Sequence, residues 1–261
     1  MSAAAIAKLY RYPVKGLSAE VLERVSLSPG RCLPQDRRFA IALGTTEFDP
    51  ARPTWLSKTH FIMLMRDEAL ARLTTRFDPD GAVLSIAENG RPLLEASLGD
   101  PEGSRRIARF FDEFTGGAVA GPLRIVEAAD HAFADARPKP NASTGQYVSL
   151  INLASIRELE GEIGAPVDPI RFRANVYFDG PPAWREQEWM ERPITVGGAG
   201  LRVISPITRC AATQVNPDTA TRDLDIVGTL MRRWGHNIMG IYAEVIDGGD
   251  IAIDDPIRVA A

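Results

Sequence analysis

The sequence predicts a β-rich α+β fold. Apolar and polar residues alternate in several short runs, whereas helical periodicity is confined to three segments. The turn sequence Glu88-Asn89-Gly90-Arg91 lies between two apolar segments and is a strong local signal for a hairpin. Apolar residues make up 45% of the 261 residues and charged residues 25%, as in a globular protein with a substantial core.

Four strand regions are expected in the first hundred residues. A loosely alternating strand covers Ala5–Val14, and a short apolar strand covers Arg38–Leu43. The turn sequence Asp78-Pro79-Asp80-Gly81 joins a strand at Leu73–Phe77 to the hairpin within Val83–Ala96. These last segments predict a three-stranded meander.

Three helices are expected from capping residues and apolar periodicity. They run from Asp100 to Gly116, from Asn152 to Gly164, and from Thr221 or Asp223 to Gly235. Their apolar stripes are interpreted as core-packing faces. Between the first two helices, His131–Gln146 contains two prolines, little apolar content and no periodicity, so we interpret it as a linker.

Composition excludes several classes of partner and site. The net charge of −4 gives no electrostatic reason to expect nucleic acid or an anionic membrane, and no run approaches the ~20 apolar residues of a membrane span. Two cysteines make no disulfide framework, which favours a soluble cytoplasmic protein. The three histidines are widely separated, so the usual zinc sites lack ligands. Any metal would take most of its donors from outside the protein.

One thiol stands in a position suited to chemistry. Cys210 directly follows Thr208 and Arg209 at the end of an alternating apolar run. A neighbouring cation favours the thiolate, which binds soft metals and attacks electrophiles. The alternative is a small buried hydrophobic residue, the role of many single cysteines. Cys32 is expected to be an inert loop thiol.

Basic residues recur beside strand ends. Lys15 lies in the turn after the first strand, and Arg37 precedes the second. Arg171 and Arg173 are predicted to share one face of a strand, with Asn175 on the same face. Strand ends meet at one rim in barrels and sandwiches, and guanidinium groups bind phosphate bidentately. A phosphate-bearing ligand is one interpretation, and solvated surface charges are the other.

Together these segments resemble the MOSC family, the molybdenum-cofactor-binding domains of cofactor sulfurases and of the mitochondrial amidoxime reducing component. The matching segments are Y-P-V-K-G-L, D-R-R-F-A-I, R-F-R-A-N-V, S-P-I-T-R-C-A-A-T-Q-V-N-P-D-T and G-G-D-I-A-I-D-D-P-I. The block around Cys210 is the specific one. The resemblance covers nearly the whole chain and implies an N-terminal β-barrel region over residues 1–125, then a MOSC β-barrel with peripheral helices over residues 140–261.

The resemblance also implies a cofactor site. Cys210 would be the protein ligand of molybdenum in a Mo-molybdopterin cofactor, the metal being otherwise held by the pterin dithiolene and oxo groups. The residues implied to contact the cofactor are Lys15, Gly16, Arg37, Asn152, Arg173, Asn175, Thr208 and Arg209. Gly16 stands where relatives often carry serine, so one side-chain hydrogen bond to the cofactor would be missing.

Three functions follow from the resemblance. The first is an oxidoreductase that reduces N-hydroxylated substrates such as amidoximes and hydroxylamines, with electrons from a separate electron-donor protein. The second is a sulfur carrier or sulfurating module that uses a Cys210 persulfide. The third is a non-catalytic carrier of the molybdenum cofactor. Molybdenum and persulfide analysis would distinguish them.

Overall fold

Seven strands form a closed β-barrel, in the order β10-β9-β13-β12-β11-β15-β1, and β10 pairs again with β1. The computed structural model describes residues 4–117, 121–140, 142 and 145–260. The barrel strands are β1 (Ala4–Arg11), β9 (Val148–Asn152), β10 (Val176–Asp179), β11 (Pro193–Val196), β12 (Ala199–Thr208), β13 (Ile238–Asp247) and β15 (Pro256–Val259). The β-rich fold class is therefore confirmed.

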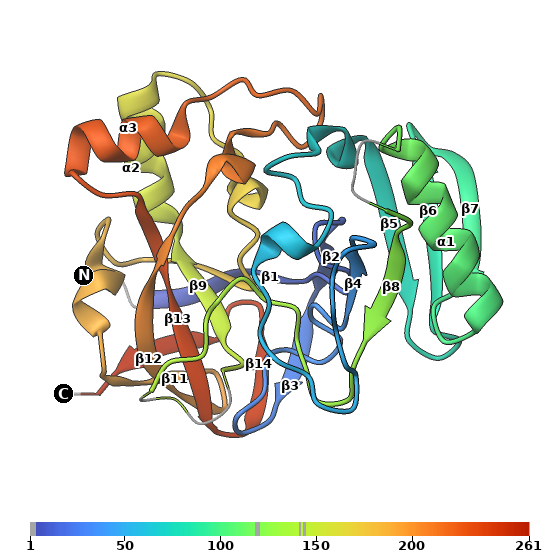
Figure 1. Ribbon diagram of the computed structural model, residues 1–261. Coiled ribbons are helices and arrows are strands. Elements are labelled where there is room, and N and C mark those ends of the chain that lie inside the picture. The colour runs from blue at the N-terminus through green and yellow to red at the C-terminus, as the bar shows by residue number, and fades with distance from the viewer. Residues whose placement is uncertain (1–3, 118–120, 141, 143–144, 261) are drawn as a thin grey trace.

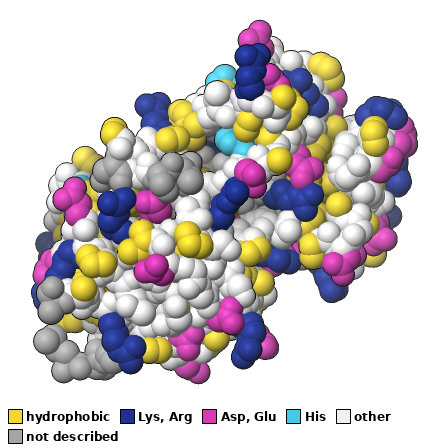
Figure 2. Space-filling view, turned by 90° about the horizontal axis from the view of Figure 1, so that it is seen from below, with side chains coloured by type: hydrophobic (Ala, Val, Ile, Leu, Met, Phe, Trp, Pro, Cys, Tyr) yellow, Lys and Arg dark blue, Asp and Glu magenta, His cyan; other side chains and the backbone are white. Residues whose placement is uncertain are grey.

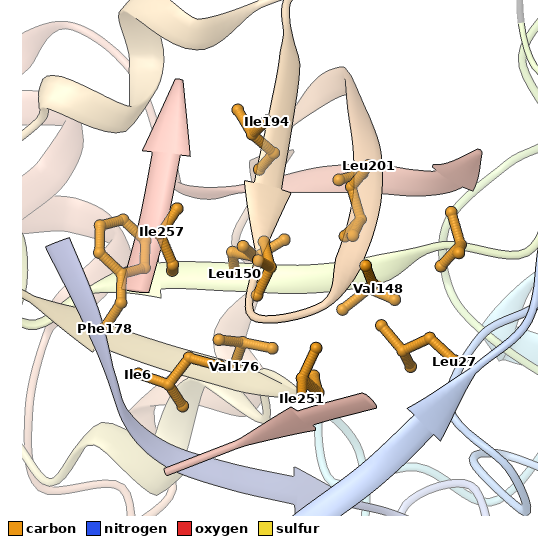
Figure 3. Packing of buried hydrophobic residues seen from close by; sticks show 14 of the residues in the cluster. Ile6, Leu27, Val148, Leu150, Val176, Phe178, Ile194, Leu201, Ile251 and Ile257 are labelled. Atoms are coloured by element: carbon orange, nitrogen blue, oxygen red, sulfur yellow. The ribbon is translucent and has the colours of Figure 1, made fainter. Parts of the chain in front are cut away.

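The barrel interior holds the largest cluster of buried apolar side chains. Leu150 of β9, Val176 of β10 and Leu201 of β12 are all fully buried, and Figure 3 shows them pointing toward one another. In a barrel, alternation along a strand sends every second side chain inward. Burial of this apolar surface is the main favourable contribution to the barrel's stability.

The two ends of the chain pair with each other. β1 is hydrogen-bonded to β10 and β15, and β2 (Glu20–Leu22) extends the sheet beyond β1. A separate ribbon pairs β3 (Arg24–Leu27) with β14 (Gly249–Ala252). Residues 4–27 thus pack with the C-terminal half. The labels N and C both lie at the left of Figure 1. The predicted domain boundaries at residues 125 and 140 stay a prediction.

A second layer lies beside the barrel, at the right of Figure 1. Its strands are β4 (Phe39–Ala42) paired with β8 (Arg124–Glu127), and the meander β5 (Leu73–Asp78), β6 (Val83–Glu88) and β7 (Arg91–Ser97). The predicted meander and hairpin are confirmed. Asn89 and Gly90 both have positive φ, 50° and 77°, as a two-residue hairpin turn requires.

Three α-helices complete the described fold: α1 (Pro101–Phe114), α2 (Leu153–Ile163) and α3 (Ile226–Trp234). Asp100 and Asn152 cap the first two, as predicted, through bonds from the backbone N–H groups of Gly103 and Ala154. α1 covers the meander, and α2 and α3 lie together above the barrel in Figure 1.

The predicted start of the third helix is wrong. α3 begins after Asp225, whose carboxylate accepts from the N–H of Gly228 at 3.0 Å. The preceding residues fold back on the loop after Cys210, because the N–H of Asp223 donates to the carbonyl of Gln214. Arg222 also lies opposite Val215 in an isolated antiparallel bridge, so this stretch is extended and the helix begins only after it.

The predicted strand through Arg171 and Arg173 is also wrong. Arg171 lies in a 3₁₀ turn at Pro169–Phe172, and Arg173 ends it with a left-handed φ of 52°. Pro169 has the fixed φ of a helix start, and Asp168 caps the turn by accepting from the N–H of Ile170. The strand β10 begins only at Val176, so alternation does not decide which way the two arginines point.

Among the described residues, no helix is long and apolar enough to cross a bilayer. Figure 2 shows one face of the molecule, on which basic and acidic side chains are interspersed with apolar and other groups.

Candidate functional site

A cleft of about 460 Å³ lies where the barrel meets the second layer. Its described lining comes from the segments after β1, β3, β4 and β12, from the 3₁₀ turn before β10 and from residues 132–139, with side chains of β9, β12 and β13. Eight of the nine predicted site residues line it: Lys15, Gly16, Arg37, Arg173, Asn175, Thr208, Arg209 and Cys210. This volume is in the range of cofactor and small-molecule sites.

The cleft is cationic although the chain is acidic. The net charge of the whole chain is −4. The described lining, in contrast, contains eight basic side chains and two acidic ones, the acidic ones being Asp36 and Asp135. Such a local excess of positive charge favours an anionic ligand.

Tyr12 lies behind the cleft lining and contacts two of the arginines that form it. Its ring is fully buried, and the guanidinium carbons of Arg37 and Arg173 each lie 4.4 Å from the ring centroid. Its hydroxyl donates to the carbonyl of Ala174 at 3.2 Å. Burial raises the pKa of Tyr12 to about 12, so the phenol stays neutral. One neutral aromatic ring thus holds two cations by cation–π contact.

The guanidinium of Arg37 is bound by both a carboxylate and the backbone. It forms an ion pair with Asp36 at 2.5 Å and donates to the carbonyl of Arg173 at 2.8 Å. Burial is the largest single effect and acts to lower the pKa of Arg37, but the Asp36 carboxylate, with Tyr12 and Tyr242, raises the pKa overall. Asp36 in turn accepts from the N–H of Tyr12 at 2.8 Å. Arg37 is therefore locked in place by charge and by the chain itself.

Arg173 differs from Arg37 in having no carboxylate. Among the described residues, the Arg173 guanidinium makes no side-chain hydrogen bond or ion pair beyond its contact with Tyr12. Burial lowers its pKa. Both arginines have left-handed backbone, with φ of 51° and 52°, a strained conformation for residues with a Cβ. An unneutralised cation held by strained backbone is the arrangement expected of an anion-binding group.

Lys15 is buried and points across the cleft. Its Nζ pairs with the carboxylate of Asp135 and donates to the carbonyl of Phe133 at 2.9 Å. Burial lowers the pKa of Lys15, and Asp135 opposes that shift. The predicted linker His131–Gln146 thus also supplies part of the cleft wall, and its residues 141, 143 and 144 lie outside the described residues. Gly16, next along, has a φ of 83°, which favours glycine.

Cys210 enters the cleft just beyond the end of β12. It is partly exposed, and its carbonyl accepts from the N–H and the hydroxyl of Thr213 at 3.0 and 2.9 Å. The preceding residue is tied to Asn237, because the Arg209 N–H donates to the Asn237 carbonyl and the Asn237 amide donates back at 2.8 Å. Thr208 is exposed beside them. The backbone on both sides of the thiol is therefore fixed.

The guanidinium of Arg209 has a structural role. It is buried and donates to the carbonyls of Met239 and Phe172, with the shortest distance 2.6 Å. It therefore joins β13 to the 3₁₀ turn. Burial lowers the pKa of Arg209. Within the described residues, no group of three or more His, Cys, Asp or Glu side chains could hold a metal ion.

The two predicted asparagines also serve the fold. Asn175 is 1% exposed, accepts from the Ser149 hydroxyl at 2.8 Å, and donates to the Tyr10 carbonyl at 3.2 Å. It joins β1 and β9 at the cleft floor. Asn152 does not line the cleft: it caps α2 and donates to the carbonyl of Pro182 at 2.8 Å. The structure therefore places Asn152 away from the other predicted site residues.

Asn152→Ala tests that structural role. The variant loses a helix cap and leaves the Pro182 carbonyl without its donor, so we expect a loss of about 2 kcal/mol in the free energy of unfolding. Urea denaturation measures this, and any metal and pterin bound by the folded protein should be unchanged. Asn152→Asp keeps the capping acceptor but places a buried carboxylate against the Pro182 carbonyl and beside Glu186, so it should lose at least as much stability. Loss of bound cofactor from folded Asn152→Ala would contradict the assignment.

Several residues that line the cleft or pack directly behind its lining were not assigned to the site from the sequence. Tyr12 and Asp36 stand inside recognisable motifs, but nothing local shows that one ring contacts two arginines. Asp135 lies in an irregular segment, and only the fold brings it to Lys15. Cys32 also lines the cleft, with its Sγ donating to the side-chain oxygen of Gln146 at 3.4 Å. Burial raises the pKa of Cys32 to about 12, consistent with the inert thiol that was predicted.

Comparison with known proteins gives two family matches that together span residues 3–258. Residues 3–134 match the MOSC N-terminal beta barrel domain, and residues 129–258 match the MOSC domain.

One curated relative and several solved structures are also similar. The molybdenum cofactor sulfurase of Bos taurus is 30% identical over 110 residues, which are 37% of this chain and 12% of that protein. This chain therefore spans only about an eighth of that relative. The YUAD protein of Bacillus subtilis is 14% identical with a TM-score of 0.45, covering 99% of this chain and 96% of that chain. YiiM from Escherichia coli is 20% identical with a TM-score of 0.33, covering 44% and 54%.

Proposed function

The chain belongs to the MOSC domain family, with the MOSC N-terminal beta barrel domain ahead of the MOSC domain, and from this premise we propose that it is a molybdenum-cofactor-dependent oxidoreductase that reduces N-hydroxylated compounds. The observation that carries the proposal is the shared cleft. A partly exposed thiol, Cys210, lines the same cavity as Arg173, a cation without a carboxylate partner among the described residues.

The residues present fit the proposed cofactor. A thiolate from Cys210 suits a soft metal whose other donors are dithiolene sulfurs. The Arg173 guanidinium suits the phosphate of a pterin, because a planar guanidinium donates two parallel hydrogen bonds to phosphate oxygens. The buried neutral ring of Tyr12 holds that guanidinium at 4.4 Å without neutralising it. Lys15 is paired with Asp135, so the charge of Lys15 is already balanced and Arg173 is the better candidate for binding the phosphate.

The proposed reaction is a two-electron reduction. An amidoxime, two electrons and two protons give an amidine and water, with cleavage of the N–O bond. When bound, the cofactor would supply the electrons, and a separate electron-donor protein would replenish them. The chain's own part is to position: Cys210 holds the metal, the Tyr12–Arg37–Arg173 stack fixes the anionic tail, and the cleft leaves room for a substrate beside the thiol.

A second candidate, a sulfur carrier that uses a Cys210 persulfide, is favoured by one comparison. The matching curated relative is named a molybdenum cofactor sulfurase, although only 37% of this chain takes part in the match. A partly exposed thiol suits persulfide transfer as well as metal binding.

Analysis of the protein purified from molybdate-fed, pterin-competent cells tests both candidates. We expect near-stoichiometric molybdenum and pterin, and conversion of benzamidoxime to benzamidine with a chemical reductant. A persulfide on Cys210 in mass spectra, without molybdenum, would favour the sulfur carrier instead. Stoichiometric cofactor without turnover of any amidoxime or hydroxylamine would contradict the reductase and indicate a cofactor carrier.

A further inference from the structure

The cleft has more cations than the proposed cofactor requires. Of its eight basic residues, Lys15 and Arg37 pair with Asp135 and Asp36. Arg171 pairs with Asp223 at 2.8 Å, and Arg209 binds backbone carbonyls. The described residues provide no ion pair for the remaining four, which are Lys58, Arg137, Lys139 and Arg173. One phosphate bound by Arg173 would leave three cations without an ion pair. Lys58 is close enough to Asp135 to lower the pKa of that carboxyl, but Asp135 is already paired with Lys15.

These three cations lie at the solvent-exposed end of the cleft. Arg137 and Lys139 are exposed and Lys58 is partly buried, whereas Lys15 and Arg209 are buried. They come from two different segments, Lys58 from the connection between β4 and β5 and the other two from the segment before β9. Because all three line the same cleft, their charges add to the positive potential that an anion bound there would meet.

An aromatic plane lies among these charges. The guanidinium carbon of Arg137 is 4.7 Å from the Trp55 ring centroid, and both residues line the cleft. Trp55 is partly buried, so one end of the cleft combines an indole surface with a stacked cation. A planar ligand that carries an anionic group can contact both, the ring by stacking and the cation by charge-assisted hydrogen bonds.

We propose that Trp55, Lys58, Arg137 and Lys139 form a substrate subsite that selects planar N-hydroxylated compounds bearing a carboxylate or phosphate. The proposal rests on the reductase function above and specifies its substrate class. The Tyr12–Arg37–Arg173 stack remains the place of the cofactor's anionic tail, and the subsite at the exposed end binds the anionic group of the substrate.

Calorimetric binding of two probes tests the subsite without requiring turnover. The probes are benzamidoxime and 4-carboxybenzamidoxime, titrated into the purified protein with its cofactor in place and no electron donor. We expect the carboxylated probe to bind at least tenfold more tightly than benzamidoxime, because one charge-assisted hydrogen bond contributes that much affinity. The ratio of the two affinities should fall as salt is added. Arg137→Ala should bring the ratio close to one, and Trp55→Leu should weaken both probes.

A matched control is Arg109→Ala on α1, an exposed arginine outside the described lining of the cleft, which should leave the ratio unchanged. Equal affinity of the two probes for the wild type would overturn the subsite. The three cations would then be assigned to the docking of an acidic electron-donor protein. A ratio that survives Arg137→Ala would overturn it as well. If the probes bind with the expected ratio but no N-hydroxylated compound is reduced, the subsite stands and the proposed reaction fails.

Discussion

Cys210→Ser should abolish both metal retention and turnover while leaving the fold intact. A serine hydroxyl is a poor ligand for a soft metal, and even changes behind a metal ligand cost about 10–100-fold in affinity or activity, so loss of the ligand itself should cost at least that. The fold should survive because the bonds that fix this segment come from its backbone: the Cys210 carbonyl accepts from Thr213, and Arg209 pairs with Asn237. Elemental analysis, benzamidoxime turnover and circular dichroism measure the three properties.

The chain supplies a matched control in its other thiol. Cys32→Ser removes a sulfur from the same cleft but keeps a donor for the side chain of Gln146, so metal content and turnover should stay near the wild-type values. If Cys210→Ser retained molybdenum, the assignment of the metal ligand would be wrong. If Cys32→Ser lost it equally, the cleft would hold the metal through both thiols.

Local chemistry explains which parts of the fold were predictable. Asp100, Asn152 and Gly235 act within a few residues of their own position, so the sequence pattern alone shows the helix ends they form. The Asn89-Gly90 turn is equally local. The start of α3 was misplaced because the residues before it are held extended against the loop after Cys210, by the bridge between Arg222 and Val215, a contact that no local pattern reveals.

Most of the residues that line the cleft could be predicted from the sequence, but the role of each one could not. Motif resemblance brought Arg37, Arg173 and Arg209 to attention as cofactor contacts, and all three line the cleft. Their partners separate them: a carboxylate for Arg37, backbone carbonyls for Arg209, and an aromatic ring alone for Arg173. Those partners lie as far as 161 positions away in the sequence, as Tyr12 does from Arg173, so only the folded chain assigns the roles.

Arg173→Ala should weaken cofactor binding strongly without destabilising the protein. Loss of a bidentate guanidinium–phosphate contact should cost about 100-fold in affinity, measured as cofactor released in a chase experiment. The cofactor-free variant should unfold at the same or a higher urea concentration than the cofactor-free wild type. Burial lowers the pKa of Arg173, which means that the charged guanidinium is less stable in the folded protein than in water. Alanine removes this unfavourable contribution. Arg173→Lys should restore only part of the affinity, because an ammonium lacks the planar pair of donors.

Arg37→Ala provides the contrast that separates a binding cation from a structural one. Both guanidinium groups lie 4.4 Å from the Tyr12 ring, but Arg37 neutralises Asp36, whose side chain is 3% exposed. Alanine at position 37 leaves that carboxylate buried and unpaired, so the free energy of unfolding of the cofactor-free protein should fall by about 3 kcal/mol. If Arg173→Ala destabilised the cofactor-free protein as much as Arg37→Ala, Arg173 would have an unrecognised structural partner. A cation that is unfavourable in the empty protein and required in the loaded one must be kept for the anion that it binds.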